Sequence, residues 1–293
     1  MNDPYAHLNE EALALISSPT EARIRFTQAD RFIEYPAASA VLKTLEDTYL
    51  RPRSVRPECI ALIADAGAGK STLLNAFRLR TQQRREAELR KPVAYAVLNA
   101  LPELHVMQAM MHDTLDIPTP SGQYRKHWLM DDVIKRTIEQ LGVALVMLDE
   151  IQHITNLPRA VRRTVWDWIK WLSTACRVSV VCSGTPGAEE VILQDRQFKT
   201  RFEIVRLPRW QVGPVFANFL HALESSLPLK QSSGLATRDM QVAILQESLA
   251  KDQVAGLTDS IRKIIASAAV QAIESGDERI TVKSVTAWRA RNA

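Results

Sequence analysis

The stretch Ala64-Asp-Ala-Gly-Ala-Gly-Lys-Ser-Thr72 decides the fold of this chain. It follows the apolar run Cys59-Ile-Ala-Leu-Ile63, which predicts a buried strand, and precedes Leu73-Leu-Asn-Ala-Phe-Arg-Leu79, which predicts a helix. A strand, a glycine-rich loop ending in Lys-Ser and a helix form the setting in which proteins bind nucleotide phosphates. The stretch departs from G-x-x-x-x-G-K-[ST] at one letter, because Ala64 stands at the first glycine. An alanine is tolerated there if its φ stays negative.

This loop suits phosphate binding because its glycines let backbone N–H groups turn toward an anion, and the following helix adds its positive N-terminus. Lys70 is expected to reach the β- and γ-phosphates, and the Ser71 hydroxyl to ligate Mg²⁺. The residues predicted to bind the nucleotide are Asp65, Ala66, Gly67, Ala68, Gly69, Lys70, Ser71 and Thr72. The alternative is an ordinary glycine-rich turn between a strand and a helix.

The composition is that of a soluble globular protein, with 46% hydrophobic and 24% charged residues in 293. The 37 basic and 33 acidic residues leave a net charge of +4, which permits nucleic-acid binding without demanding it. Three isolated cysteines and no C-x-x-C support neither a disulfide framework nor a zinc site. No bilayer-length apolar stretch or signal peptide is evident, so we expect a cytoplasmic protein.

Strands and helices alternate through the middle of the chain. Strands are predicted at residues 59–64, 92–98, 143–148, 178–182 and 202–207, and helices at 70–90, 103–115, 128–141, 158–175 and 187–194. This alternation predicts an α/β fold with a parallel sheet that is covered on both faces. The strand signals stop after Pro208, and helices are predicted at 211–227, 237–250, 256–274 and 281–290. The predicted domains are an N-terminal extension (1–57), an α/β core (58–208) and a helical domain (209–293).

A second nucleotide signal is the apolar run Leu145–Leu148, which ends in Asp149 and Glu150. Ligands of parallel sheets lie at the carboxyl ends of the strands. Asp149 is expected to hold Mg²⁺, directly or through water, and Glu150 to orient and deprotonate the attacking water. Many strands end in acidic turns, but adjacent carboxylates are costly unless a cation compensates them. Combined with Lys70 and Ser71, the pair therefore predicts a phosphate and metal site.

Two further segments suit the same chemistry. Ser183 or Thr185, at the end of the next strand, would lie beside the γ-phosphate, although Ser-Gly-Thr-Pro also fits a plain turn. Arg196 and Arg201 precede the last strand, so they would point away from their own nucleotide and toward a neighbouring subunit. An arginine supplied in this way stabilises charge in phosphoryl transfer. The alternative is that both arginines belong to a solvated turn.

Four segments of the chain resemble an AAA+ ATPase: Ala64–Thr72, Leu145–Glu150, Ser183–Thr185 and Arg201–Phe202, followed by a helical lid. The chain is more closely similar to the TniB/TnsC transposition ATPases, and more distantly to phage MuB, over roughly residues 20–290. The segments that carry this closer resemblance are Asp30–Pro36, Asp149–His153, Ser183–Gly187 and Arg201–Pro208.

The resemblance implies a P-loop NTPase core with a small all-α lid, and a slow ATPase that uses ATP and Mg²⁺. It implies a regulator of transposition that assembles on duplex DNA as rings or filaments and disassembles on hydrolysis. The implied partners are a DDE transposase and a TniQ-type target-selection protein. By the same resemblance Ile33 and Tyr35 flank the adenine, and Arg201 precedes Arg196 as the arginine acting in trans. The position that often carries an arginine in AAA+ lids is Asp259 in this chain, and Arg262 follows one helical turn later.

Two basic segments are candidates for contact with the DNA backbone, which needs only Lys or Arg at phosphate spacing. The candidate residues are Arg125, Lys126, Arg159, Arg162 and Arg163. Charge runs are also common on solvated faces of proteins.

Three other functions remain alternatives. A small-molecule kinase with a phosphate loop is disfavoured by the adjacent Asp149-Glu150 pair and the long helical C-terminus. A helicase loader or replication initiator belongs to the same superfamily, and no dedicated winged-helix domain is evident after residue 210. A signalling NTPase would carry a repeat array or effector domain, which we do not find.

Overall fold

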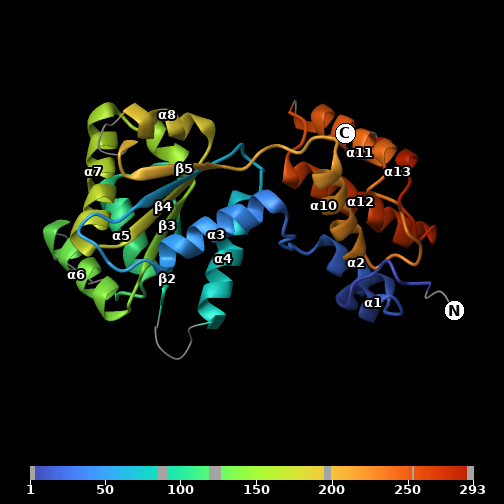
Figure 1. Cartoon of the computed structure of the whole chain (residues 1–293), viewed down its shortest axis with the longest axis horizontal. Coiled ribbons are helices and arrows are strands. Elements are labelled where there is room, and N and C mark those ends of the chain that lie inside the picture. The colour runs from blue at the N-terminus through green and yellow to red at the C-terminus, as the bar shows by residue number, and fades with distance from the viewer. Residues whose placement is uncertain (1–3, 85–90, 119–126, 195–198, 253, 289–293) are drawn as a thin grey trace. The chain divides into compact units, whose positions relative to one another are not determined.

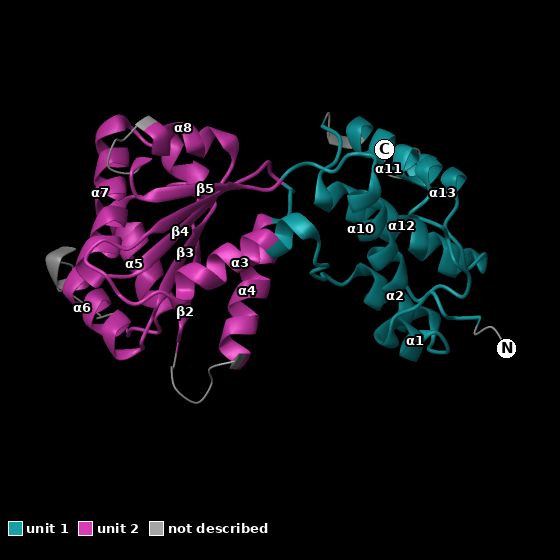
Figure 2. Ribbon diagram, in the orientation of Figure 1, with its two compact units in different colours: residues 1–39, 67–69, 208–293 teal, residues 40–66, 70–207 magenta. Residues whose placement is uncertain are grey.

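The computed structural model describes residues 4–84, 91–118, 127–194, 199–252 and 254–288. The chain divides into two compact units (Figure 2). The first contains residues 1–39, 67–69 and 208–293, and the second contains residues 40–66 and 70–207. The predicted domain limits of 58–208 and 209–293 are a separate division of the chain, and they stay a prediction.

The second unit is built on a parallel sheet, as predicted. Its strands are β1 (Cys59–Ile63), β2 (Val93–Val97), β3 (Leu145–Asp149), β4 (Ser179–Gly184) and β5 (Phe202–Arg206), in the order β2-β3-β4-β1-β5. All four strand pairs are parallel. β4 lies between β1 and β3, and the three strands are parallel. Their carboxyl ends, which carry the glycine-rich loop, Ser183 and Asp149, therefore meet at one edge of the sheet.

Helices cover both faces of this sheet, which explains why its central strands are almost wholly buried. Figure 1 shows α3 (Pro36–Leu50) and α4 (Lys70–Arg84) on one side and α5 (Leu104–Thr114), α6 (His127–Gln140) and α7 (Arg159–Cys176) on the other. A further helix, α8, spans Pro186–Gln194. The α5–α7 side forms one hydrophobic core with alternate strand residues such as Val146, Leu148 and Val180.

The first unit is helical in its described part. It contains α1 (Glu10–Leu15), α2 (Thr20–Gln28), α10 (Pro214–Ser225), α11 (Arg238–Asp252), α12 (Thr258–Ser275) and α13 (Val282–Thr286). Its core is formed by apolar residues that include Phe216, Leu220, Ile244, Ile261 and Ile264. The predicted all-helical region after Pro208 is therefore confirmed. Across the described ranges no helix combines the length and the apolarity that a membrane span requires.

Helix α2 was not predicted, and its composition explains why. Both of its buried residues, Arg23 and Thr27, are polar, so the helix lacks the apolar stripe that reveals an amphipathic helix. Arg23 is 4% exposed and forms an ion pair with Glu278, and its guanidinium also donates to the Pro228 carbonyl oxygen. The helix is thus bound to its unit by a buried polar network.

Candidate functional site

The glycine-rich loop has the backbone geometry expected of a phosphate cradle. Gly67 and Gly69 have φ values of 77° and 93°, which side-chain-bearing residues rarely adopt. Ala64 is not among the residues with positive φ, and its N–H donates to the Gly184 carbonyl oxygen at 3.1 Å. Ala64 thus extends the hydrogen-bond ladder between β1 and β4, and its backbone conformation tolerates a methyl group. The alanine that stands at the first glycine of the motif is therefore compatible with this loop.

Lys70 begins α4 and is only 5% exposed. Its Nζ donates to the carbonyl oxygens of Ala64 and Asp65 at 2.8 and 2.9 Å. Burial lowers the pKa of Lys70, and the Asp149, Glu150 and Asp65 carboxylates oppose that effect. The ammonium group is therefore held against its own loop and close to the acidic edge of the sheet.

Asp149 ends β3 and is completely buried. Its two carboxylate oxygens are both engaged: Oδ1 accepts the Glu150 N–H at 2.9 Å, and Oδ2 accepts the Tyr95 hydroxyl at 3.0 Å. Sequence reasoning missed Tyr95, which lies on the neighbouring strand β2. The partner of Asp149 becomes visible only when the strand order is known.

Glu150 has a φ of 62°, an uncommon value for a residue with a side chain. It is followed by the 3₁₀ helix η1 (Ile151–Asn156), in which Gln152 donates through Nε2 to the Glu150 carboxylate. The Oε1 atom of Gln152 accepts the Thr185 N–H at 3.3 Å. Gln152, a second residue that sequence reasoning missed, thus links the proposed base to the end of β4.

Ser183 is completely buried, and its Oγ has no hydrogen-bond partner within the described residues. Buried hydroxyls almost always have a partner, so an orphaned one calls for a ligand or water. Thr185 is partly exposed and contacts Gln152 through its backbone. The roles proposed for these two residues stay predictions.

Arg201 lies at the opposite, amino edge of the sheet. Its carbonyl oxygen accepts the Cys59 N–H at 3.0 Å, at the start of β1. Its Nη1 is buried and has no hydrogen-bond partner in the described part of the chain. Arg201 is therefore remote from Asp149 within its own sheet. Arg196 lies outside the described residues, so its role stays a prediction.

The candidate DNA-binding residues fall into two groups. Arg159 and Arg163 are exposed at the start of α7, where Arg163 pairs with Asp167 at 3.8 Å. Arg162 is half-buried and donates to the Thr155 carbonyl oxygen at 3.2 Å. Arg125 and Lys126 lie outside the described residues.

The first unit holds the predicted adenine-flanking residues. The Tyr35 ring lies 4.6 Å from Trp210 and 5.9 Å from Phe219, centroid to centroid, and Ile33 packs on the same cluster. Burial raises the pKa of Tyr35 to about 12. Arg262 pairs with Asp30 at 2.8 Å, so its guanidinium has a carboxylate partner within this unit.

Residues 67–69 of the loop belong to this unit, and α12 begins against them. The Asp259 N–H donates to the Gly67 carbonyl oxygen at 2.9 Å, and the Thr258 hydroxyl donates to that of Ala68 at 3.1 Å. The Trp210 indole N–H in turn donates to the Thr258 hydroxyl at 3.0 Å. The loop tip and the aromatic cluster are therefore connected through one threonine.

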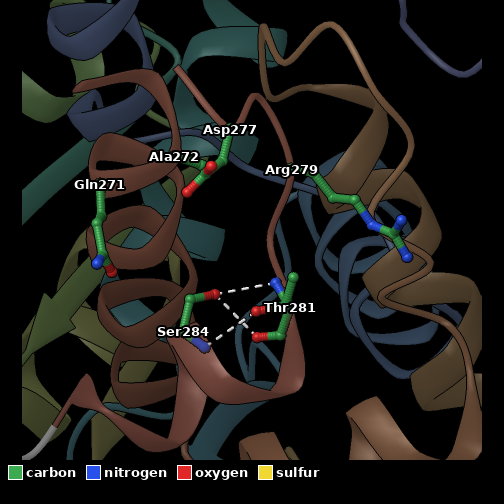
Figure 3. A pocket seen from close by; sticks show the side chains of 6 residues that line it. All are labelled: Gln271, Ala272, Asp277, Arg279, Thr281 and Ser284. Carbon is green, nitrogen blue, oxygen red and sulfur yellow. Dashed lines mark hydrogen bonds between the residues drawn. The ribbon is translucent and has the colours of Figure 1, made fainter. Parts of the chain in front are cut away.

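A polar hollow beside α12 and α13 does not form a second site (Figure 3). It is lined by Gln271, Ala272, Asp277, Arg279, Thr281 and Ser284. Thr281 and Ser284 hydrogen-bond to each other as a capping box at the start of α13, and Asp277 accepts from Ser275. These groups stabilise the turn and the short helix.

Comparisons with known proteins identify the family and the fold. The model of a family described as bacterial TniB protein matches residues 23–212. No sequence among curated proteins matches the chain significantly. Among solved structures, the Aeropyrum pernix ORC1 protein in complex with DNA has a TM-score of 0.63 and 16% identity, over 92% of this chain and 69% of that chain.

Two other solved structures share the fold. The Aeropyrum pernix ORC2 protein, in ADPNP-ADP complexes, has a TM-score of 0.68 and 14% identity, over 92% of this chain and 72% of that one. The Saccharomyces cerevisiae Hsp104-ADP complex has a TM-score of 0.52 and 14% identity, over 89% of this chain and 34% of that one. At such identities the similarity concerns the fold, which is that of the AAA+ ATPases.

Proposed function

The chain belongs to the bacterial TniB family and has an AAA+ ATPase fold, and from this premise we propose that it regulates DNA transposition as an ATP-dependent, DNA-binding switch. In this proposal the protein oligomerises on duplex target DNA while it holds ATP. It recruits a transposase and a target-selection partner in that state, and it disassembles when ATP is hydrolysed.

The observation that carries the ATPase part is the convergence of three strand ends at one edge of the sheet. The loop after β1 brings Lys70, β3 brings Asp149 and Glu150, and β4 brings Ser183. A buried ammonium group, a buried carboxylate and an orphaned buried hydroxyl at one edge suit an anionic ligand with its cation. A structural turn alone would not require any of them.

Each side chain has a role in this proposal. Lys70 binds the β- and γ-phosphates, Glu150 orients and deprotonates the attacking water, and Ser183 or Thr185 contacts the γ-phosphate. The Ser71 hydroxyl and the Asp149 carboxylate hold Mg²⁺, and these oxygen donors are of the kind that this ion prefers. When bound, the ion neutralises charge on the phosphates. Ile33 and Tyr35 flank the adenine.

DNA binding and self-association are proposed from the family and from exposed basic side chains of the chain. Arg159 and Arg163 contact DNA phosphates in this proposal, together with Arg125 and Lys126, whereas Arg162 is engaged with Thr155. The ORC1 structure in complex with DNA shares the fold, which supports DNA as a partner. A DDE transposase and a TniQ-type protein are the partners that the family suggests.

The test compares wild type with Glu150→Gln by negative-stain electron microscopy and by phosphate release, each with and without duplex DNA. We expect rings or filaments only when both nucleotide and DNA are present. Wild-type assemblies should disappear as ATP is consumed, whereas Glu150→Gln should keep them. Phosphate release should fall by about 100-fold or more, because a positioned general base contributes at least that factor.

The matched control is Glu190→Gln, which changes an exposed glutamate of α8 in the same unit and should behave as wild type. Normal hydrolysis by Glu150→Gln would count against the mechanism. Monomers that turn over ATP equally with and without DNA would favour a kinase. Isolated complexes at one DNA sequence would favour an initiator, the second candidate, since ORC1 and ORC2 share the fold.

A further inference from the structure

Tyr95 occupies a position that the sheet register makes special. It lies in the middle of β2, whose residues pair with β3 so that Tyr95 is opposite Met147 and Val97 is opposite Asp149. Side chains two positions apart share a face of a strand, so Tyr95 and Asp149 project to the same side of the sheet. The two positions are offset by about 6.6 Å along the strand direction, a distance that an extended tyrosine side chain can span.

The Tyr95 hydroxyl lies beside two groups from different elements. It donates to Asp149 Oδ2 at 3.0 Å, and the Ser71 hydroxyl, in the first turn of α4, lies near it. Asp149 and Ser71 are the two residues proposed to hold Mg²⁺. One phenol oxygen from β2 thus bonds to Asp149 and lies near Ser71.

The contacts restrain the Asp149 carboxylate on both sides. Its Oδ1 accepts the Glu150 N–H while its Oδ2 accepts Tyr95, so rotation of the carboxylate would break a hydrogen bond. A tyrosine hydroxyl is protonated at neutral pH, so the phenol serves as the donor in this contact. Carboxylates that ligate metals commonly need such an outer partner to fix their orientation.

The ring of Tyr95 is not a core residue. It is only partly buried and lines a hollow between α4 and the start of β2, together with Arg78, Gln82 and Lys91. Here the hydroxyl, rather than the ring, makes the specific contact.

We propose that Tyr95 is a positioning residue that holds the Asp149 carboxylate, beside the Ser71 hydroxyl, in the arrangement that receives the metal ion. This inference rests on the proposed nucleotide and metal site, and it assigns a function to a residue of β2 that the loop and carboxylate motifs do not include. Tyr95 acts through Asp149 and does not itself bind the ion.

The experiment measures binding of a fluorescent ADP to the full chain, first in EDTA and then across a Mg²⁺ titration. For Tyr95→Phe we expect unchanged affinity in EDTA and a Mg²⁺ concentration for half-maximal response that is raised about tenfold, the usual effect of losing an outer-shell partner. The control Tyr49→Phe removes a hydroxyl from α3, where the ring packs on Phe77 at 6.2 Å, and should match wild type.

A second measurement separates positioning from general damage. In an Asp149→Asn background, Tyr95→Phe should have no further effect on the Mg²⁺ response, because the two residues act as one unit. An unchanged Mg²⁺ response in Tyr95→Phe, or effects that simply add, would overturn the role of Tyr95 while leaving the proposed function intact. Wild type that binds no nucleotide would instead overturn both.

Discussion

At the residue scale, Gly184 shows how closely the chain folds around the proposed base. A Cβ at this position would lie 2.7 Å from Ile151 Cγ1 and 3.1 Å from both Ala188 Cβ and Gln152 Oε1. Its φ is not positive, so the position needs glycine for space. The space is needed because η1 returns over the end of β4 directly after Glu150.

We predict that Gly184→Ala lowers the free energy of unfolding by about 1–3 kcal/mol, the usual cost of forcing an extra methyl into a filled space. Gly187→Ala is the matched control, since a Cβ there meets nothing within 4 Å. Urea unfolding of both variants checks the prediction. Equal stability of the two variants would mean that η1 can move away from β4 at little cost.

At the element scale, Glu224 connects the end of α10 to the loop that follows it. Its Oε1 accepts the backbone N–H groups of Ser233 and Gly234 at 2.6 and 3.0 Å, and its Oε2 accepts that of Leu235 at 2.8 Å. The Ser232 hydroxyl also donates to Oε1, at 2.8 Å. One carboxylate therefore satisfies a whole stretch of loop backbone.

This geometry gives a pH dependence with a definite sign. Desolvation raises the pKa of Glu224, but the hydrogen bonds from Ser232 and the loop outweigh it, and the net pKa lies below the ordinary 4.5. A carboxyl whose pKa is lowered by folding contributes stability above its unfolded value and loses it as the pH falls through the folded value. The loop should therefore loosen under acid, at pH values below 4.5.

We predict that Glu224→Gln lowers the opening free energy of residues 228–235 by about 1–3 kcal/mol at neutral pH, because one buried acceptor is lost and backbone donors are left unpaired. Hydrogen exchange on this segment measures the change. The variant should also lose the acid sensitivity seen in wild type. Glu274→Gln, at an exposed position of α12, serves as control. Wild-type exchange in Glu224→Gln would show that the loop is held by its apolar contacts alone.

At the scale of the whole molecule, the position of Arg201 bears on assembly. Lys70 and Arg201 lie at opposite edges of the same sheet, so one chain cannot bring both to one phosphate. If the arginine acts in trans, each active site combines Lys70 of one chain with Arg201 of the next. ATP would then be bound at the interface between subunits.

We predict that Lys70→Ala and Arg201→Ala each abolish DNA-dependent ATP turnover, and that mixing the two restores part of it. In the mixture, the Lys70→Ala chain supplies its intact arginine to the Arg201→Ala chain. Mixing Lys70→Ala with Glu150→Gln is the control. Both chains keep Arg201, but each lacks a residue of its own site, so this mixture should restore nothing. Phosphate release is the measurement. No recovery in the first mixture would remove Arg201 from the trans role.

The sheet was predictable, and the central site residues could be proposed, because their signals are local. β1 is a continuous apolar run and β3 is apolar up to Asp149, and the Lys70 loop and Asp149–Glu150 stand directly at the ends of these runs. The helix α2 escaped prediction because its buried side chain Arg23 is charged and needs Glu278, which is remote in sequence. Tyr95 escaped because its partner Asp149 lies on another strand, and Gln152 because one of its partners, Thr185, is remote in sequence.

The sequence by itself determined the class of fold and the chemistry of the loop, since apolar period, glycine placement and the Lys70-Ser71 pair are properties of neighbouring residues. Only the tertiary structure decided that β2 lies beside β3, and therefore that Tyr95 contacts Asp149. It also decided that Ala64 is compatible with the loop, through its place on the β1–β4 ladder. The physical reason is that strand order and side-chain partnership arise from pairing between distant segments, which no local pattern records.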